Sequence, residues 1–329
     1  MGKRVVVIGS NSFSGASFIR YLLAQGYETL GISRSIENSP CLLPYRWDDC
    51  SRFRFRQLDL NLHSQEIIEA IREFKAPYVV NFAAQAMVAE SWENPDHWYQ
   101  TNVLANVRLH DQLRKLDFLA KYLHVSTPEV YGSCSGLVQE DHPFSPSTPY
   151  ATSRASCDMH LTNFHDNYGF PVVFTRAANV YGPGQQLYRI IPRTILFIKT
   201  GRKLQLHGGG KSLRSFIHIG DVSEATLKIL TEARSPEAYH LSTDQHVSIR
   251  ELVELICRRM GASFEELVEI SPDRPGKDAA YLLDGAKALN EFGWKPKVSL
   301  EEGLDETISW VEDNYDDLSK EPMEYQHKE

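Results

Sequence analysis

Short apolar runs rich in β-branched residues alternate with helix-like patterns through the first half of the chain. The strand-like runs lie at residues 4–8, 29–32, 53–58, 78–82, 122–126 and 172–175. Between them, apolar residues recur at helical spacing from Phe18 to Leu23 and over 64–74, 96–116 and 150–168. Strands that alternate with helices predict an α/β fold with a doubly wound parallel sheet. In such a sheet, ligands bind at the carboxyl ends of the strands.

The pattern changes after about residue 180. Glycine clusters at 182–184 and 208–210 divide the chain into shorter elements, while 249–260 and 300–314 indicate helices. We therefore expect a smaller C-terminal α/β lobe, with a return of the chain to the sheet near 215–242. The predicted boundaries assign 1–178 and roughly 215–242 to the sheet domain, and 179–214 and 243–329 to the lobe. The polar residues after Pro322 are expected to fray.

Composition and charge narrow the function classes. The 329 residues are 42% hydrophobic and carry a net charge of −8, with no basic stripe. Nucleic-acid binding is therefore not expected, because a phosphate backbone requires a positively charged surface. The five cysteines are dispersed without CxxC spacing, which indicates reduced thiols and neither a disulfide framework nor a zinc site. No apolar stretch has the length of a membrane span or a signal peptide, so we predict a cytoplasmic protein.

A glycine-rich turn joins the first strand to the first helix, with the sequence Gly9-Ser-Asn-Ser-Phe-Ser-Gly15. This spacing between a strand and a helix is typical of the Rossmann-type turn, whose backbone N–H groups hold a pyrophosphate. Ser12 takes the place of a middle glycine, where its side chain either crowds a phosphate or donates to it. A plain turn is the alternative interpretation. The predicted cofactor contacts from this turn are Gly9, Asn11, Ser12, Phe13 and Gly15.

The end of the second strand indicates which dinucleotide binds. An acidic residue there would hold the ribose diol of NAD, whereas Ser33 and Arg34 suit the 2′-phosphate of NADP. We therefore predict NADP, with NAD less favoured and an exposed surface arginine as the other interpretation of Arg34. Asp59 either bonds the adenine amino group or caps the following helix. Leu60 and Ala83 are further predicted cofactor contacts.

Tyr150 and Arg154 open the helix after Pro149 and lie one helical turn apart on the same face. A free tyrosine has a pKa of about 10. Because the guanidinium favours the phenolate, we expect the pair to act as a base near neutral pH. Such a base would take a sugar hydroxyl proton while hydride passes to nicotinamide. Both residues are also predicted to contact the cofactor.

Longer motifs carry a family resemblance over nearly the whole chain. They are VVNFAAQ (79–85), TNV (101–103), STPEVYG (126–132), SPSTPYATSRAS (145–156), NVYGPGQQLYRIIPRTI (179–195), RSFIHIGDV (214–222) and DRPGKDAAYLLD (273–284). These motifs resemble the extended short-chain dehydrogenase/reductases, and within them the nucleotide-sugar 4,6-dehydratases. GYETLGISRSIENS (26–39) is similar to the NADP-using GDP-mannose dehydratases, and GWKPKVSLEEGL (293–304) to the dTDP-glucose dehydratases. The resemblance implies a lyase that transiently oxidises a nucleotide-diphosphate sugar at C4 and eliminates water across C5–C6.

The family's catalytic segment is only partly matched. There, a threonine holds the sugar 4-oxygen, an aspartate protonates the leaving 6-hydroxyl and a glutamate removes the C5 proton. The resemblance gives the first and last roles to Thr127 and Glu129, but Pro128 stands at the aspartate position and Arg154 replaces the family's lysine. Either Glu129 serves as base and acid, as in GDP-mannose dehydratases, or the product is a 5,6-unsaturated sugar. A 4-epimerase, a sugar-acid decarboxylase, a substrate without a 6-hydroxyl and an NADP-binding non-enzyme with a degenerate site stay open.

The resemblance also implies substrate contacts and an assembly. The predicted substrate-binding residues are Gln85, Ser91, Thr127, Asn179, Arg189, Arg214 and Arg274. The three arginines suit the charges of a pyrophosphate. The sheet domain would then bind the dinucleotide and the smaller lobe the nucleotide sugar. The family dimerises through the helices predicted at 96–116 and 150–168, so we expect a homodimer. His160 and His165 have poor spacing for a metal, and no metal is predicted.

Overall fold

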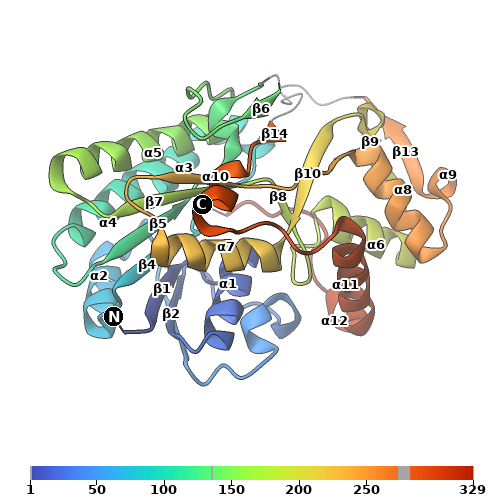
Figure 1. Cartoon of the computed structure of the whole chain (residues 1–329). Helices are drawn as coiled ribbons and strands as arrows, with labels where there is room; N and C mark the ends of the chain where they lie inside the picture. The colour runs from blue at the N-terminus through green and yellow to red at the C-terminus, as the bar shows by residue number, and fades with distance from the viewer. Residues whose placement is uncertain (1, 135, 273–281, 329) are drawn as a thin grey trace.

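A seven-stranded sheet forms the centre of the molecule, in the order β11-β7-β5-β4-β1-β2-β3 (Figure 1). The computed structural model describes residues 2–134, 136–272 and 282–328. The strands are β1 (Arg4–Ile8), β2 (Glu28–Ser33), β3 (Phe53–Gln57), β4 (Tyr78–Asn81), β5 (Lys121–Val125), β7 (Val172–Ala177) and β11 (Ala238–Leu241). All neighbouring pairs are parallel, and the strand order reverses between β1 and β4. The predicted doubly wound parallel sheet is confirmed.

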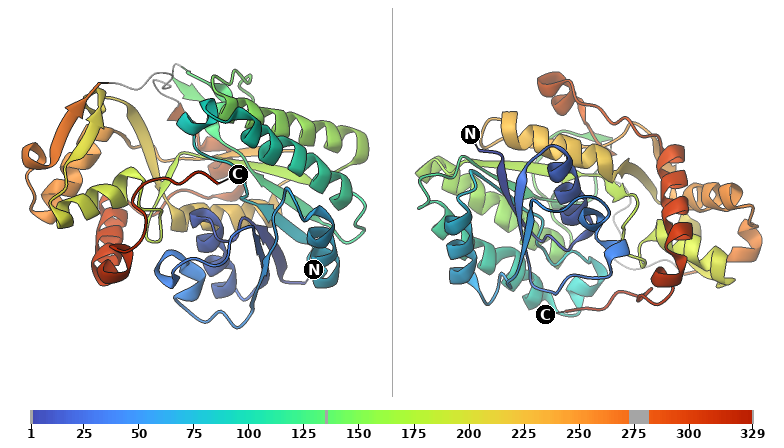
Figure 2. Two further views of the ribbon diagram at one scale, coloured as in Figure 1. Left: turned by 180° about the vertical axis from the view of Figure 1, so that it is seen from behind. Right: turned by 90° about the horizontal axis from the view of Figure 1, so that it is seen from below.

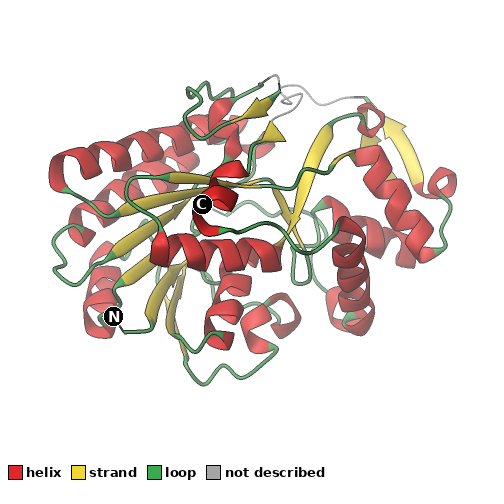
Figure 3. Cartoon of the chain, in the orientation of Figure 1, coloured by secondary structure: helices red, strands yellow, loops and turns green. Residues whose placement is uncertain are grey.

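Helices cover both faces of this sheet (Figure 3). In β1, Val5 and Val7 pack into one buried cluster and Val6 and Ile8 into another, because successive side chains point to opposite faces. The first cluster includes residues of α1 (Phe13–Ala24) and α7 (Ile219–Glu232). The second includes residues of α2 (Ser64–Phe74), α4 (Asn106–Leu113) and α5 (Pro149–Tyr168). Burial on both faces explains why the β1 sequence is apolar without alternation.

The helix predicted over 96–116 contains an interruption. It consists of α3 (Pro95–Tyr99), a π-helical turn at Gln100–Ala105, and α4, which ends at Leu113. Two buried asparagines of this segment bond to the carboxyl end of β4 and the loop after it. Asn102 Nδ2 donates to the Gln85 carbonyl at 3.0 Å, and Asn106 Oδ1 accepts from Asn81 Nδ2 at 2.7 Å. The π turn therefore lies beside the edge of the sheet where ligands bind, a frequent place for such turns.

The chain beyond residue 178 builds smaller sheets and the remaining helices. The strands are β8 (Asn179–Tyr181), β9 (Leu204–His207), β10 (Leu213–His218), β12 (His246–Ser248), β13 (Val268–Ser271) and β14 (Leu282–Leu283), which pairs with β6 (Leu137–Val138). The helices are α6 (Ile190–Thr200), α8 (Ile249–Met260), α9 (Phe264–Leu267), α10 (Ala286–Phe292), α11 (Leu300–Asp313) and α12 (Tyr315–Leu318). Between residues 215 and 242, β11 joins the large sheet, whereas β10 lies between β12 and β8 in a separate sheet.

Single 3-10 turns connect several elements. They are Pro40–Leu42, Pro44–Arg46, Ala89–Trp92, Pro128–Tyr131 and Gly208–Gly210. Across the described ranges, no helix combines the length and the apolar character that crossing a membrane requires.

The C-terminal segment runs back from α12 toward the carboxyl edge of the large sheet (Figure 2). It is not frayed, contrary to the sequence-based expectation. Met323 packs against the buried cluster of α6 and α11, Glu324 pairs with Arg193 at 2.8 Å, and the His327 ring stacks on His97. Polar residues in this segment are thus held by contacts with distant elements, which local composition does not reveal.

Candidate active site

The glycine-rich turn after β1 is shaped by close backbone approach. Gly9 has φ +83°, and a Cβ there would lie 2.6 Å from the Ala83 nitrogen. A Cβ on Gly15 would lie 2.3 Å from the Gly9 carbonyl oxygen. Ser12 caps α1, since its Oγ accepts from the Gly15 N–H at 3.1 Å and donates to the Gly9 carbonyl at 2.7 Å. The Ser12 hydroxyl therefore closes the turn itself, a role that neither sequence-based alternative for Ser12 included.

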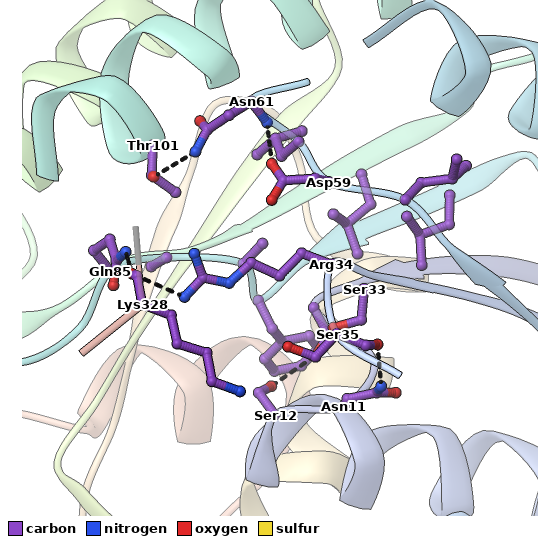
Figure 4. A pocket seen from close by; sticks show the side chains of 18 of the residues that line it. Asn11, Ser12, Ser33, Arg34, Ser35, Asp59, Asn61, Gln85, Thr101 and Lys328 are labelled. Atoms are coloured by element: carbon purple, nitrogen blue, oxygen red, sulfur yellow. Dashed lines mark hydrogen bonds between the residues drawn. The ribbon is translucent and has the colours of Figure 1, made fainter. Parts of the chain in front are cut away.

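A cavity of about 220 Å³ opens beside this turn, at the carboxyl edge of the sheet (Figure 4). The predicted cofactor residues that line it are Gly9, Asn11, Ser12, Ser33, Arg34, Asp59, Leu60 and Ala83. The predicted residues outside its lining are Phe13, Gly15, Tyr150 and Arg154. Phe13 instead packs in the core beneath α1. Most of the predicted cofactor contacts thus surround one cavity, and their contacts with a ligand stay predictions.

Asn11 and Asp59 hold the loops of the cavity in place. Asn11 Nδ2 donates to the Ser35 and Ile36 carbonyls, each at 3.0 Å, which ties the turn after β1 to the loop after β2. Asp59 Oδ1 accepts from the Asn61 N–H at 2.7 Å. The residue before α2 is His63, so Asp59 does not cap that helix.

Five polar residues that were not among the predicted site residues also line the cavity: Ser35, Asn38, Asn61, Thr101 and Lys328. Ser35 and Asn38 follow Arg34 closely, and Thr101 belongs to the TNV motif, so those motifs could have indicated them. Lys328 comes from the C-terminal segment, and no local signal marks it. Its carbonyl accepts from Gln85 Nε2 at 2.6 Å and from Arg34 Nη2 at 3.2 Å.

The turn after β5 carries the predicted catalytic hydroxyl and carboxylate. Thr127 has extended backbone geometry and caps the 3-10 turn Pro128–Tyr131, with its Oγ1 accepting from the Glu129 N–H at 3.4 Å. Pro128 occupies the first position of that turn, where its fixed φ suits the geometry and its missing N–H costs nothing. The proline therefore has a structural place, while Thr127 is buried and Glu129 half-buried.

Tyr150 lies at the start of α5, beside this turn. Thr148 caps the helix by accepting from the Ala151 N–H at 3.1 Å, and the Tyr150 hydroxyl bonds with the Thr127 side chain. Burial raises the pKa of Tyr150, and the Glu129 charge raises it further, whereas Arg154, the Thr127 hydrogen bond and Arg189 lower it. The net pKa is raised. Arg154 thus favours the phenolate as expected, but burial outweighs the guanidinium in this structure, and the action of the pair as a base near neutral pH stays a prediction.

Arg154 is 2% exposed and points beneath the end of β5. Its Nη2 donates to the Val125 carbonyl and lies 3.1 Å from His124 Nε2. Burial, and then Arg154, lower the pKa of His124 well below its usual value, so the neutral imidazole can accept this hydrogen bond. Arg154 Nε and Nη1 are buried and have no hydrogen-bond partner among the residues that the structure describes.

A buried polar cluster near Arg154 brings His110, His124 and Cys157 donor atoms within 4.8 Å of one another. His124 already accepts from Arg154, and His110 Nε2 lies 2.9 Å from the Tyr122 hydroxyl. The Arg154 guanidinium next to the cluster disfavours a metal cation there. We interpret the cluster as a hydrogen-bonded part of the core.

The predicted substrate residues are not all gathered at one surface. Arg189 precedes α6, and its charge lowers the pKa of Tyr150. Asn179 begins β8 and donates to the Ser215 carbonyl at 3.3 Å, while Arg214 lies on β10 opposite Val247. Ser91 is fully buried, and its hydroxyl donates to the Val88 carbonyl at 2.6 Å. Arg274 lies outside the described residues.

Known proteins share both the sequence and the fold. Residues 6–307 match the family described as GDP-mannose 4,6 dehydratase. A probable dTDP-glucose 4,6-dehydratase of Sinorhizobium fredii is 31% identical over 94% of this chain and 93% of its own. The dTDP-D-glucose 4,6-dehydratase of Mus musculus is 32% identical over 95% and 90%.

Solved structures extend the likeness to a second reaction. The dTDP-glucose 4,6-dehydratase of Streptomyces venezuelae, determined with NAD bound, has a TM-score of 0.88 at 31% identity, over 95% of this chain and 98% of that one. The UDP-glucose 4-epimerase of Thermotoga maritima, determined with UDP-glucose, has a TM-score of 0.87 at 25% identity, over 95% and 99%. Fold similarity therefore extends to both dehydratases and epimerases.

Proposed function

The chain belongs to the GDP-mannose 4,6-dehydratase family and to the enzymes of the extended short-chain dehydrogenase/reductase superfamily, and we propose that it eliminates water across C5–C6 of a nucleoside-diphosphate hexose. One observation carries this proposal. Thr127, Glu129 and Tyr150 come together at the carboxyl edge of the sheet, the edge at which the dinucleotide-type cavity opens.

A nicotinamide cofactor fits the residues beside this group. The absence of a Cβ at Gly9 and Gly15 allows the close turn that a pyrophosphate needs. Arg154 lies outside the lining of the cavity, with its Nε and Nη1 buried, so its contact with the ribose stays a prediction. When bound, the cofactor supplies the acceptor, and later the donor, of the sugar hydride.

NADP is the proposed form of the cofactor. Ser33, Arg34 and Ser35 line the cavity at the end of β2, where a 2′-phosphate would lie. Asp59 is the sole carboxylate among the described residues that line this cavity, and it bonds the Asn61 N–H. Solved relatives with NAD bound make NAD the alternative.

Each catalytic side chain has a proposed role. Tyr150 takes the proton of the 4-hydroxyl, with the Arg154 and Arg189 charges opposing the effect of burial on its pKa. Thr127 holds the 4-oxygen. The C4 carbonyl then acidifies the C5 proton, which Glu129 removes, and the C5–H electron pair forms the C5–C6 double bond as the 6-hydroxyl leaves.

Pro128 leaves Glu129 as the proton donor for the departing hydroxyl. The proton that Glu129 takes from C5 would pass to the 6-hydroxyl, which leaves as water. Hydride return to C6, with a proton from solvent added at C5, gives a 4-keto-6-deoxy sugar, whereas hydride return to C4, with the Tyr150 proton returning to the 4-oxygen, gives a 5,6-unsaturated sugar. A 4-epimer or a decarboxylated sugar are further outcomes to be tested.

The substrate and the assembly complete the proposal. dTDP-glucose is the first candidate substrate, since the relatives carry that name. Arg189 and Arg214, with Arg274, would bind its pyrophosphate from the smaller lobe (179–214 and 243–329), while 1–178 and 215–242 bind the dinucleotide. Exposed apolar side chains on the predicted dimer helices, Tyr99, Leu104, Met159 and Tyr168, favour a homodimer.

The test is product mass. Purified protein is incubated with NADP, and separately with NAD, against dTDP-, GDP-, UDP- and CDP-hexoses and the corresponding nucleoside-diphosphate hexuronic acids. Loss of one water identifies the substrate and the cofactor, and NMR separates the 4-ketone from the 5,6-alkene. An unchanged mass with an epimeric product indicates a 4-epimerase, loss of carbon dioxide a decarboxylase, and no conversion of any sugar would refute enzymatic function on these substrates.

A further inference from the structure

A buried ion pair lies beneath the turn that carries Thr127 and Glu129. Asp158 of α5 and Arg176 of β7 are 1% and 3% exposed, and Asp158 Oδ2 lies 2.9 Å from Arg176 Nη2. Removing two charges from water is costly, and a buried pair often stabilises a fold no better than apolar residues do. Stability alone is therefore a weak explanation for this pair.

The pair contacts both ends of the turn. Ser126 Oγ, before Thr127, donates to Asp158 Oδ2 at 2.6 Å. Arg176 Nη1 donates to the hydroxyl of Tyr131, the last residue of the turn, at 2.7 Å. The same two charged side chains thus hold the residues that flank Thr127, Pro128 and Glu129.

Strand register and helix spacing bring these four residues together. Val125 of β5 pairs with Thr175 of β7, so Ser126 and Arg176 are the next residues along neighbouring strands. Asp158 follows Tyr150 by eight residues on α5, with Arg154 midway, and residues four apart share a helix face. One face of α5 therefore carries the proposed base, its cation and Asp158.

Tyr131 is fixed from several sides. Its hydroxyl lies 2.8 Å from His240 Nε2, and the Arg176 guanidinium lies over the Tyr131 and Phe144 rings at 5.2 and 5.1 Å. Burial raises the pKa of Tyr131 to about 12, and burial lowers that of His240 to about 3. A protonated phenol next to a neutral imidazole therefore keeps the same hydrogen bonds across the working pH range.

We propose that Asp158 and Arg176 are positioning residues that hold the Ser126–Tyr131 turn as one unit, so that Glu129 reaches the C5 proton of a sugar bound at Tyr150. The proposal rests on the proposed function, since it assigns these residues to its elimination step. Tyr150 is carried by α5, so its own position is set by that helix, although its hydroxyl faces Thr127 and Glu129 of the turn. Loosening the turn should therefore slow elimination more than the first oxidation.

The test removes one hydroxyl at each end and leaves the ion pair in place, which avoids the unfolding expected when one member of a buried pair is replaced. Ser126→Ala, Tyr131→Phe and the double variant are compared with Ser156→Ala, whose hydroxyl bonds only to Thr152 of the same helix among the described residues. Absorbance at 340 nm follows reduced cofactor, and mass spectrometry follows water loss.

Each single variant is expected to lower the elimination rate about 10-fold, because small misplacements of catalytic groups cost up to about 100-fold. KM should stay near that of the parent, and reduced cofactor should accumulate. The double variant should be little slower than either single variant, because releasing one end already frees the unit. The proposal would be overturned if the double variant slowed elimination by the product of the two single effects. Equal slowing of oxidation and elimination would also overturn it.

Amide hydrogen exchange separates this proposal from the proposed function. Exchange over 127–131 should rise in Ser126→Ala and Tyr131→Phe but not in Ser156→Ala, whether or not a substrate is known. If the parent converts no nucleotide sugar, the proposed function fails, but hydrogen exchange still tests whether Asp158 and Arg176 hold the Ser126–Tyr131 turn. Unchanged exchange in both Ser126→Ala and Tyr131→Phe would refute the positioning role of Asp158 and Arg176 and leave the proposed function unaffected.

Discussion

Two turns at the carboxyl edge of the sheet solve similar problems by different means. The turn after β1 and the turn after β5 each contain a hydroxyl residue that caps the helical turn following it, Ser12 in the first and Thr127 in the second. In the first, Gly9 and Gly15 allow backbone atoms to approach, and the turn is closed by its own residues. In the second, side-chain hydrogen bonds hold the turn, and they come from Asp158 of α5 and Arg176 of β7.

The two turns should therefore be sensitive to different kinds of substitution. A turn built from backbone geometry should fail when its shape changes, whatever the chemistry of the new side chain. A turn built from side chains should tolerate small changes of shape but fail when a functional group is exchanged. Substitutions in the two turns should therefore differ both in the size of their effects and in the step that they impair.

Glu129→Gln keeps the size of the side chain and removes its ability to take a proton. Elimination should fall by about 10²- to 10⁴-fold, the usual contribution of a general base, while 4-oxidation continues. Mass spectrometry of the product and absorbance of the reduced cofactor measure the two steps. Elimination at the parental rate would show that another group removes the C5 proton.

Gly15→Ala adds one methyl group and no chemistry. The new Cβ would lie 2.3 Å from the Gly9 carbonyl and 2.9 Å from Ser12 Oγ, so the turn must open. We expect the free energy of unfolding to fall by about 3 kcal/mol, and cofactor affinity by about 100-fold. Thermal unfolding and cofactor titration measure both.

Gly285→Ala is the matched control for that variant. Gly285 has an ordinary φ of −91°, and the nearest atom to its added Cβ is the Ser242 carbonyl oxygen at 3.7 Å. Stability and cofactor affinity should stay within experimental error. Equal losses in both glycine variants would contradict the role assigned to backbone approach at Gly15.

The contrast between the turns also explains what the sequence could predict. Strands, the helices at 64–74 and 249–260, and the glycine-rich turn follow from local patterns, and the structure has them. The π turn at Gln100–Ala105 depends on bonds from Asn102 and Asn106 to distant residues, which no local pattern contains. The three-stranded sheet β12-β10-β8 is built from short strands without clear alternation.

The candidate site shows the same division. The residues of the glycine-rich turn and of the loops after β2 and β3 lie close together around the cavity, as strand order requires. Asp158 could have been found from its four-residue spacing with Tyr150 and Arg154. Arg176 could not, because only the pairing of β5 with β7 brings it to Ser126 and Tyr131. The net pKa of Tyr150 depends on burial, which spacing does not measure.

Arg34→Ala tests whether the Arg34 side chain recognises the 2′-phosphate of NADP at the cavity beside the glycine-rich turn. Loss of a charge-assisted hydrogen bond, about 1.5–3 kcal/mol, should weaken NADP binding by about 10- to 100-fold and leave NAD binding nearly unchanged. Fluorescence titration with both cofactors measures this. Arg56→Ala, an exposed arginine of β3 paired with Glu73, serves as control. A parallel loss for NAD and NADP would remove the support for NADP preference.

Deletion of residues 326–329 tests whether the C-terminal segment, which lines the cavity through Lys328, weakens cofactor binding. Lys328 contributes a carbonyl that occupies donors of Gln85 and Arg34, and the 220 Å³ cavity is smaller than the roughly 300–1,000 Å³ usual for ligand pockets. Freeing one or two hydrogen bonds should tighten cofactor binding by about 2- to 10-fold. Weaker binding after the deletion would mean that the segment supports the cofactor.

Pro128→Ala is the mildest change, since alanine can adopt the same turn. The proline stabilises the turn by restricting the unfolded chain, so the free energy of unfolding should fall by about 0.4–1 kcal/mol, with elimination almost unchanged. Denaturant titration and product formation measure the two effects. A large fall in the elimination rate would show that the turn after β5 also depends on its backbone shape.

The position of Lys328 bears on how the protein should be produced. The Lys328 carbonyl bonds to Arg34 and Gln85 at the cavity, so a histidine tag attached near this residue would bring imidazole donors close to the proposed cofactor site. Arg4, at the start of β1, lies at the opposite edge, because all strands of the sheet run the same way. Affinity tags and fluorescent fusions therefore belong at the amino end.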